Sequence, residues 1–146
     1  MIEIVLLTLT ILNVIMTKST VKEAYCSYEI AKLLKEKGFD EKCHSSYWGS
    51  SDNVDYTDFP LNYNDNNSSC SRPTHQMAMA WLREVHKVLI VIDAYHADHW
   101  EGYIDSFEIS IYSHASTIIV PNEIAHHTDY TEAVETAIKY SLEKLI

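Results

Sequence analysis

The stretch KVLIVIDAY, residues 87–95, is a continuous run of β-branched and apolar side chains that is too short to form a helix of its own. Such a run predicts a strand that is covered on both faces, or nearly so. The stretch YIDSFEISIY, residues 103–112, alternates apolar and polar side chains and predicts a half-buried strand. We expect the two strands to pair antiparallel across the loop 96–102. A short third strand at 117–120 is expected to end at Pro121.

Three amphipathic segments with recognisable ends predict helices around these strands. The first is capped by Ser27 and ends where Gly38 supplies a left-handed residue. The second begins at Thr74, and its apolar side chains recur with the period of 3.6 residues that one helix face requires. The third opens with a capping-box pair, Asp129 and Glu132, and runs to the end of the chain.

The sequence between the first two helices is less regular. Residues 42–48 have weak strand character, and residues 49–73 are rich in Ser, Asn and Asp, which favour turns. We interpret 49–73 as a long irregular insertion, a surface loop or a binding loop, with at most one short strand near 59–63. The predicted order is α-β-loop-α-β-β-(β)-α. It indicates an α+β fold, a two-layer sandwich of about three helices on one small, mainly antiparallel sheet of three to five strands.

Length and composition fit a single domain preceded by an apolar leader. The 146 residues, 47% of them apolar, match ordinary globular usage. Residues 1–15 are shorter than the roughly 20 apolar residues of a spanning helix, and they lack the positive start of a signal peptide. We therefore expect translation to begin at Met16, one domain over 16–146, and no stable membrane insertion. A membrane-associated anchor or a strand that joins the sheet are the alternatives.

The net charge and the cysteines restrict the possible partners and the cellular compartment of the protein. Lys and Arg number 11 against 21 Asp and Glu, which gives a net charge of −10 and no basic stripe for phosphates. Direct binding to nucleic acid is therefore not expected. The three cysteines are odd in number and share no short spacing, which predicts free thiols in a reducing cytoplasm.

The densest group of histidines offers one candidate metal site. His96, Asp98 and His99 fall within four residues of the chain, and the pair at 126–127 is a candidate for completing the site. The spacing is generic on a loop, so solvent-exposed histidines are the interpretation that we prefer. Motifs for nucleophilic catalysis, phosphate loops and dinucleotide binding are absent from the sequence. We therefore favour a protein that is not an enzyme, and we expect no cofactor.

The start of the second helix offers a candidate anion pocket. Free N–H groups at a helix start, with Arg72 and His75 beside them, are suited to bind a small anion. The alternative is that Thr74 only caps the helix and that its neighbours are ordinary first-turn residues. Aromatic side chains of the two long loops are candidate contacts for a partner. The candidate binding residues are Arg72, Thr74, His75, Gln76, Trp48, Tyr56 and Trp100.

Three segments resemble a known group of proteins: SYEIAKLLKEKGFDEKC, PTHQMAMAWLREVHKVLIVI and YTEAVETAIKYSLEKLI. Over residues 25–43, 73–92 and 129–146 the chain is similar to small proteins from phages and mobile elements of gut Bacteroidales bacteria, a group with no assigned activity. The resemblance agrees with a start at Met16. It implies an accessory protein in the cytoplasm of a bacterial host that binds a host or phage component, and it implies no site residues.

These observations predict a non-enzymatic binding module that presents the loops 49–73 and 96–102 to a partner. The partner is a host or phage protein, or a small anionic ligand. The alternative is a small metal-dependent or histidine-dependent hydrolase built on His96, Asp98 and His99. A third interpretation is a virion or assembly component, and each of the three is compatible with a homo-oligomer.

Overall fold

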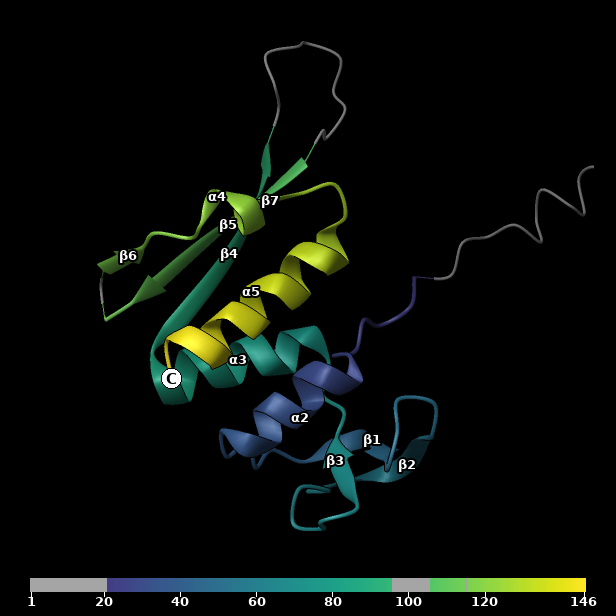
Figure 1. Ribbon diagram of the computed structural model, residues 1–146. Helices are drawn as coiled ribbons and strands as arrows, with labels where there is room; N and C mark the ends of the chain where they lie inside the picture. Colours follow the sequence, from purple (N-terminus) through teal and green to yellow (C-terminus); the bar gives the residue numbers. More distant parts are fainter. Residues whose placement is uncertain (1–20, 96–105, 115) are drawn as a thin grey trace, which may run out of the picture.

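The computed structural model describes residues 21–95, 106–114 and 116–146 (Figure 1). The predicted leader 1–15, the start at Met16 and the loop 96–102 lie outside the described residues. The elements in chain order are α2 (Tyr28–Glu36), β1 (Cys43–Trp48), β2 (Val54–Leu61), β3 (Ser69–Ser71), α3 (His75–His86), β4 (Val88–Tyr95), β5 (Ser106–Ser113), β6 (Ser116–Ile118), α4 (Asn122–Ala125), β7 (His126–His127) and α5 (Tyr130–Lys144).

The strands form two antiparallel sheets. The first has the order β2-β1-β3, and the second has the order β4-β5-β6 with β7 also paired to β5. In the second sheet Ile90 lies opposite Ile111 and Ile92 lies opposite Ile109, which is the predicted antiparallel pairing. The predicted α+β fold with mainly antiparallel strands is confirmed. The structure adds that the strands are divided between two sheets.

The first sheet accounts for the stretch 49–73, which we expected to be irregular. Two strands lie in it, β2 and β3, and both pair with β1. Most side chains of β2, which is an edge strand, are exposed, so neither face of the strand is well covered. The alternation that identifies a half-buried strand is therefore missing from its sequence. Pro60 is tolerated in β2 because an edge strand has one row of backbone groups outside the sheet.

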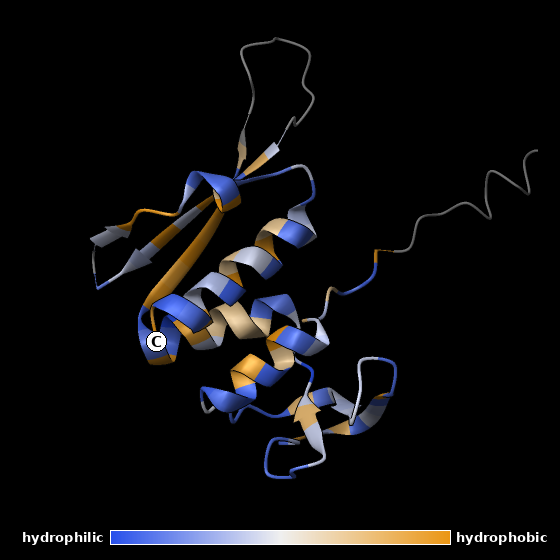
Figure 2. Ribbon diagram, viewed as in Figure 1, coloured by the Kyte–Doolittle hydropathy of each residue, from blue (hydrophilic) through white to orange (hydrophobic). Residues whose placement is uncertain are grey.

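The helices pack on one face of the second sheet, and α2 connects them to the first. Helices α3 and α5 contact β4, and α2 contacts both α5 and β3 (Figure 1). The largest fully buried side chain is Phe39, just after α2, and others come from α2, α3, α5 and β5, among them Ile30, Leu82, Ile111 and Ile138. Strand β4 is apolar along most of its length (Figure 2). Leu89 is nevertheless 41% exposed, so β4 is covered on one face and not on both as predicted.

The ends of the helices follow the sequence signals. The side chains of Ser27, Thr74 and Asp129 each accept a hydrogen bond from the backbone N–H three residues later, which caps α2, α3 and α5. Gly38, just after α2, has a φ of +87°, the left-handed conformation expected of it. Capping is a local interaction, which explains why the sequence alone places these ends.

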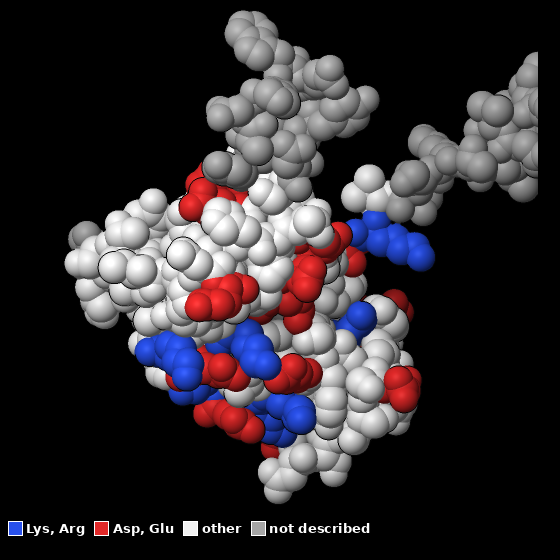
Figure 3. All heavy atoms as spheres, turned by 45° about the horizontal axis from the view of Figure 1, so that its top comes forward, with Lys and Arg blue, Asp and Glu red and all other residues white. Residues whose placement is uncertain are grey.

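Charged groups of both signs share the surface. On the face that Figure 3 shows, Lys and Arg side chains lie among Asp and Glu side chains and do not form a separate basic patch. Among the residues that the structure describes, no helix is long and apolar enough to cross a membrane.

Candidate metal centre

Two short backbone segments bring Cys26 and His75 together. The N–H of Cys26 donates to the carbonyl of Pro73 at 2.9 Å, and the N–H of His75 donates to the carbonyl of Ala24 at 3.0 Å. The residue before the cap of α2 thereby lies beside the first residue of α3. The thiol of Cys26 also donates a weak hydrogen bond to the carbonyl oxygen of Thr74, with Sγ 3.9 Å from that oxygen.

Glu135, in the second turn of α5, completes the cluster. Its Oε1 lies 2.7 Å from Nε2 of His75. The same oxygen accepts the backbone N–H of Ser27 at 2.9 Å, and Oε2 accepts the Ser27 hydroxyl at 2.6 Å. The carboxylate is thus held by three hydrogen bonds from two other helices, which orients it toward the ring of His75.

One sulfur, one nitrogen and one oxygen converge in this cluster. The ligand atoms of Cys26, His75 and Glu135 all lie within 4.8 Å of one another. Cys26 and His75 are buried, and the side chain of Glu135 is 23% exposed. The cluster therefore lies in the interior, with its carboxylate nearest to solvent. These donor types are those that bind transition-metal ions, above all zinc.

The electrostatics of the cluster favour a neutral thiol beside a charged carboxylate. Burial raises the pKa of Cys26 well above its ordinary value, and the charge of Glu135 raises it further. Burial on its own would raise the pKa of Glu135 too, but the hydrogen bonds from His75 and Ser27 outweigh it and the pKa falls below its ordinary value. A protonated thiol is a poor nucleophile, so the raised pKa of Cys26 does not favour nucleophilic attack by its sulfur. A bound metal cation would instead displace the thiol proton.

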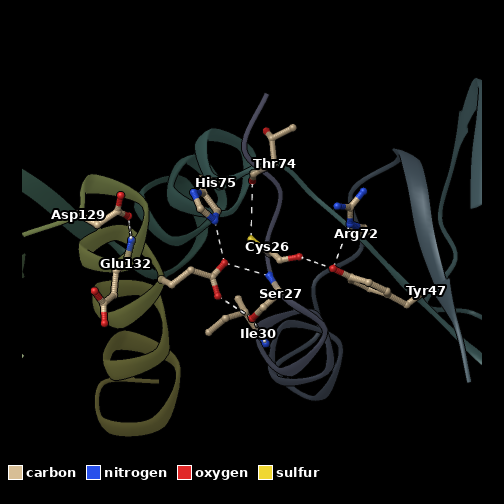
Figure 4. A network of polar contacts seen from close by, with 10 residues as sticks. Cys26, Ser27, Ile30, Tyr47, Arg72, Thr74, His75, Asp129 and Glu132 are labelled. Carbon is tan, nitrogen blue, oxygen red and sulfur yellow. Dashed lines mark hydrogen bonds and ion pairs between the residues drawn. The ribbon is translucent and has the colours of Figure 1, made fainter. Parts of the chain in front are cut away.

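A second network extends from Cys26 to Arg72. The hydroxyl of Tyr47 donates to the backbone carbonyl of Cys26 at 2.9 Å and accepts from Nε of Arg72 at 3.0 Å (Figure 4). The Arg72 guanidinium also donates to the hydroxyl of Tyr56 at 2.8 Å and lies 4.3 Å from the ring centre of Tyr25. Aromatic rings and hydroxyls thereby hold Arg72 close to the cluster.

Two of the predicted binding residues, Arg72 and Tyr56, therefore meet in the structure. Thr74 caps α3 with its side chain, and Gln76 is exposed in the first turn. Trp48 is half-buried and donates its indole N–H to the hydroxyl of Ser46. The ring of His75 contacts the carboxylate of Glu135 and so has an anionic partner already. An anion site formed by 72–76 stays a prediction.

The predicted histidine site is not described. His96, Asp98, His99 and Trp100 lie outside the described residues. His126 lies in β7, which pairs with β5, and its side chain is exposed.

Sequence reasoning missed Cys26 and Glu135 as partners of His75. Sixty residues separate His75 from Glu135 along the chain, and Cys26 lies far before both. Metal-site motifs are recognised by short spacings, and this cluster has none. The one local signal is that Cys26 and His75 each stand next to a predicted helix cap, Ser27 and Thr74. The chain matches no protein-family model, no curated protein and no solved structure.

Proposed function

We propose that this protein binds one zinc ion through Sγ of Cys26, Nε2 of His75 and a carboxylate oxygen of Glu135. The observation that carries the proposal is the convergence of these three ligand atoms within 4.8 Å in the interior. Zinc ligand bonds measure about 2.0–2.3 Å, so small side-chain movements place all three atoms on one ion. The hydrogen bond between His75 and Glu135 would give way to two bonds to the metal.

The charges of the ligands fit a divalent cation. A thiolate from Cys26 and a carboxylate from Glu135 together carry two negative charges, and a neutral His75 carries none. One divalent ion therefore leaves the buried site without net charge, which avoids the cost of an unpaired charge in the interior. The soft sulfur and the imidazole favour zinc over magnesium or calcium, which prefer oxygen ligands.

The surroundings supply the support that metal ligands need. Ser27 donates its backbone N–H and its hydroxyl to Glu135, so the carboxylate is oriented before any ion binds. Outer hydrogen bonds of this kind fix the geometry of a ligand and raise metal affinity. The hydroxyl bond falls on Oε2, which leaves Oε1 on the side of His75.

Three protein ligands leave a fourth position of a tetrahedral ion for water or a substrate. This arrangement is typical of catalytic zinc rather than structural zinc, which has four protein ligands. Water bound to zinc loses a proton near neutral pH and attacks esters, amides or phosphates. The alternative of a small metal-dependent hydrolase would then centre on Cys26, His75 and Glu135 rather than on His96, Asp98 and His99.

Metal analysis of the protein without a histidine tag tests the proposal. We expect about one zinc per chain after dialysis, and a cobalt-substituted form with a thiolate-to-metal charge-transfer band. The substitution Cys26→Ser should abolish that band and weaken zinc binding by at least about 100-fold, because it removes a ligand. The matched control Cys70→Ser replaces another buried cysteine outside the cluster and should leave both unchanged.

Two results would overturn the zinc centre. One is the absence of saturable zinc binding in a chain that circular dichroism shows to be folded. The other is an equal loss of affinity in Cys26→Ser and Cys70→Ser. Glu135→Gln and His75→Gln provide the second check, since each should weaken zinc binding independently of the thiol.

A second candidate function is the binding of a protein partner by β2. Tyr56, Phe59 and Leu61 are 61%, 79% and 51% exposed, and all three lie on this one edge strand. Large apolar side chains that gather on a surface mark contacts with other proteins. This observation supports our interpretation of 49–73 as a contact region, and it is independent of the zinc centre.

Site-specific photocrosslinking in expressing cells distinguishes this candidate. A photoreactive residue at position 59 should give one discrete adduct, and Leu61→Ser should reduce it. A photoreactive residue at position 85 is the control, because Val85 is 56% exposed on α3. The same adduct from both positions would count against a contact through β2, and so would its persistence in Leu61→Ser.

A further inference from the structure

A groove of about 600 Å³ lies between α2 and the first sheet. One wall is α2, with Tyr28, Lys32 and Lys35. The other wall is formed by Gly49, after β1, and by the segment that leads into β3, where Ser68 lies. Its volume lies in the range of sites that bind small molecules. It shares no lining residue with the cluster of Cys26, His75 and Glu135.

Hydrogen bonds tie the two walls of the groove together. The hydroxyl of Tyr28 donates to the carbonyl of Gly49 at 3.2 Å, and Nζ of Lys35 donates to the carbonyl of Ser69 at 2.6 Å. Gly49 in turn donates its N–H to the carbonyl of Ser68 at 3.0 Å. The groove is therefore formed before any ligand arrives, which reduces the entropy lost on binding.

Two lysines, Lys32 and Lys35, line this groove in a protein whose net charge is −10. Lys32 lies with its ammonium 4.8 Å from the ring centre of Tyr28, and Lys35 donates to backbone carbonyls. None of the ion pairs among the described residues involves either lysine, whereas Lys139 of α5 is paired with Glu29. Within the part of the chain that the structure describes, Glu36 is the single carboxylate that lines the groove. The lysine charges are thus available to an anion.

We infer that this groove binds a small phosphate-bearing ligand, with Lys32 and Lys35 contacting the phosphate. Two ammonium groups, set one helical turn apart, balance the roughly two negative charges of a phosphate monoester. Lysine is an established phosphate ligand that acts as a point charge and does not require a fixed angle. The ring of Tyr28, which lines the groove, offers an apolar surface beside the phosphate.

Isothermal titration of the full chain with inorganic pyrophosphate tests the inference. Zinc is first removed with a chelator that is then dialysed away, so that the pyrophosphate cannot bind a metal instead. We expect saturable binding that weakens as salt rises, since the contact is electrostatic. Lys32→Gln should weaken it by about tenfold or more, because one of two charges is lost. Lys42→Gln, at an exposed lysine outside the groove, should change it less than about twofold.

Lys32→Gln is the decisive variant, because Lys35 also holds the groove together through its carbonyl bonds. The inference fails if pyrophosphate does not bind in a saturable way, or if Lys42→Gln weakens binding as much as Lys32→Gln does. Cys26→Ser, measured without the chelator step, lacks one of the proposed zinc ligands and should leave pyrophosphate binding intact. A failure of the groove is thereby separated from a failure of the zinc proposal.

Discussion

Ser27 and Glu135 connect the start of α2 to α5 across 108 residues of sequence. The Ser27 hydroxyl donates to Oε2 of Glu135 at 2.6 Å, and the same hydroxyl accepts the N–H of Ile30. One side chain thus caps its own helix and binds the carboxylate of another. Because His75 contacts that carboxylate too, three helices share one partly buried charge.

This shared charge makes stability depend on pH. The pKa of Glu135 is lowered in the folded protein from an ordinary value of 4.5. A lowered carboxyl pKa contributes stability that is present above about pH 4.5 and lost as the pH falls through the folded pKa. We expect Glu135→Gln to lower the free energy of unfolding by about 1.5–3 kcal/mol at pH 7. The difference from the unmodified chain should shrink as the pH drops below 4.5, measured by urea unfolding.

The matched control for that experiment is Glu143→Gln, since Glu143 is exposed on the same helix. It should change the free energy of unfolding by less than about 0.5 kcal/mol at either pH. An equal effect of the two substitutions, or a pH-independent loss in Glu135→Gln, would contradict the role given to the partly buried carboxylate of Glu135.

The three thiols should react slowly in the folded chain. Cys26, Cys43 and Cys70 are all buried, and burial raises the pKa of each, that of Cys43 to about 11. Few thiolates are then present at neutral pH, and reagents reach them poorly. A chromogenic disulfide reagent should label none of them rapidly at pH 7.5 and all three in denaturant. Rapid labelling of one cysteine without denaturant would show that its environment is more open.

Gly38→Ala should destabilise the end of α2. The φ of Gly38 is +87°, and a Cβ built there has no heavy atom within 4 Å. Any cost is therefore one of backbone conformation, about 1 kcal/mol, and not of a steric clash. Gly38→Asn is the comparison, because Asn adopts the left-handed conformation more readily. The expectation is refuted if thermal unfolding shows that Gly38→Ala leaves stability unchanged or costs less than Gly38→Asn.

Ile138 of α5 tests the shared core between the helices and the second sheet. Its side chain is fully buried, so Ile138→Ala should cost about 2–5 kcal/mol and Ile138→Val about 0.5–1.5 kcal/mol. Ile119→Ala is the control, because Ile119 is 90% exposed and should be within about 0.5 kcal/mol of neutral. Chemical denaturation gives all three values. A loss at Ile119 as large as that at Ile138 would place the core elsewhere.

The caps and the strand pair show what local sequence predicts well. Ser27, Thr74 and Asp129 were predicted as caps from the residues that follow them, and each accepts the expected hydrogen bond. The strands β4 and β5 were predicted from their apolar patterns and pair as expected. These features depend on neighbours within a few residues, or on burial of a whole face. A cap leaves a polar residue at a fixed offset from the helix, and burial of a whole face leaves a hydrophobic period in the sequence.

The first sheet shows where local patterns fail. Strands β2 and β3 pair with β1 through backbone groups, which every residue carries, and β2 leaves most of its side chains exposed. No hydrophobic period is then needed, and the stretch resembles a loop. The exposure of Leu89 has a related cause, since coverage of the outer face of β4 depends on where the helices pack and not on its own residues.

By itself, the sequence determined the helix ends, the central strand pair and the α+β class, because hydrogen bonds and burial within short segments specify them. The tertiary structure alone decided that Cys26, His75 and Glu135 meet, and that Lys32 and Lys35 line a groove against the first sheet. Contacts between distant residues depend on how helices pack around one core. Such packing brings together residues whose spacing along the chain follows no recognisable pattern.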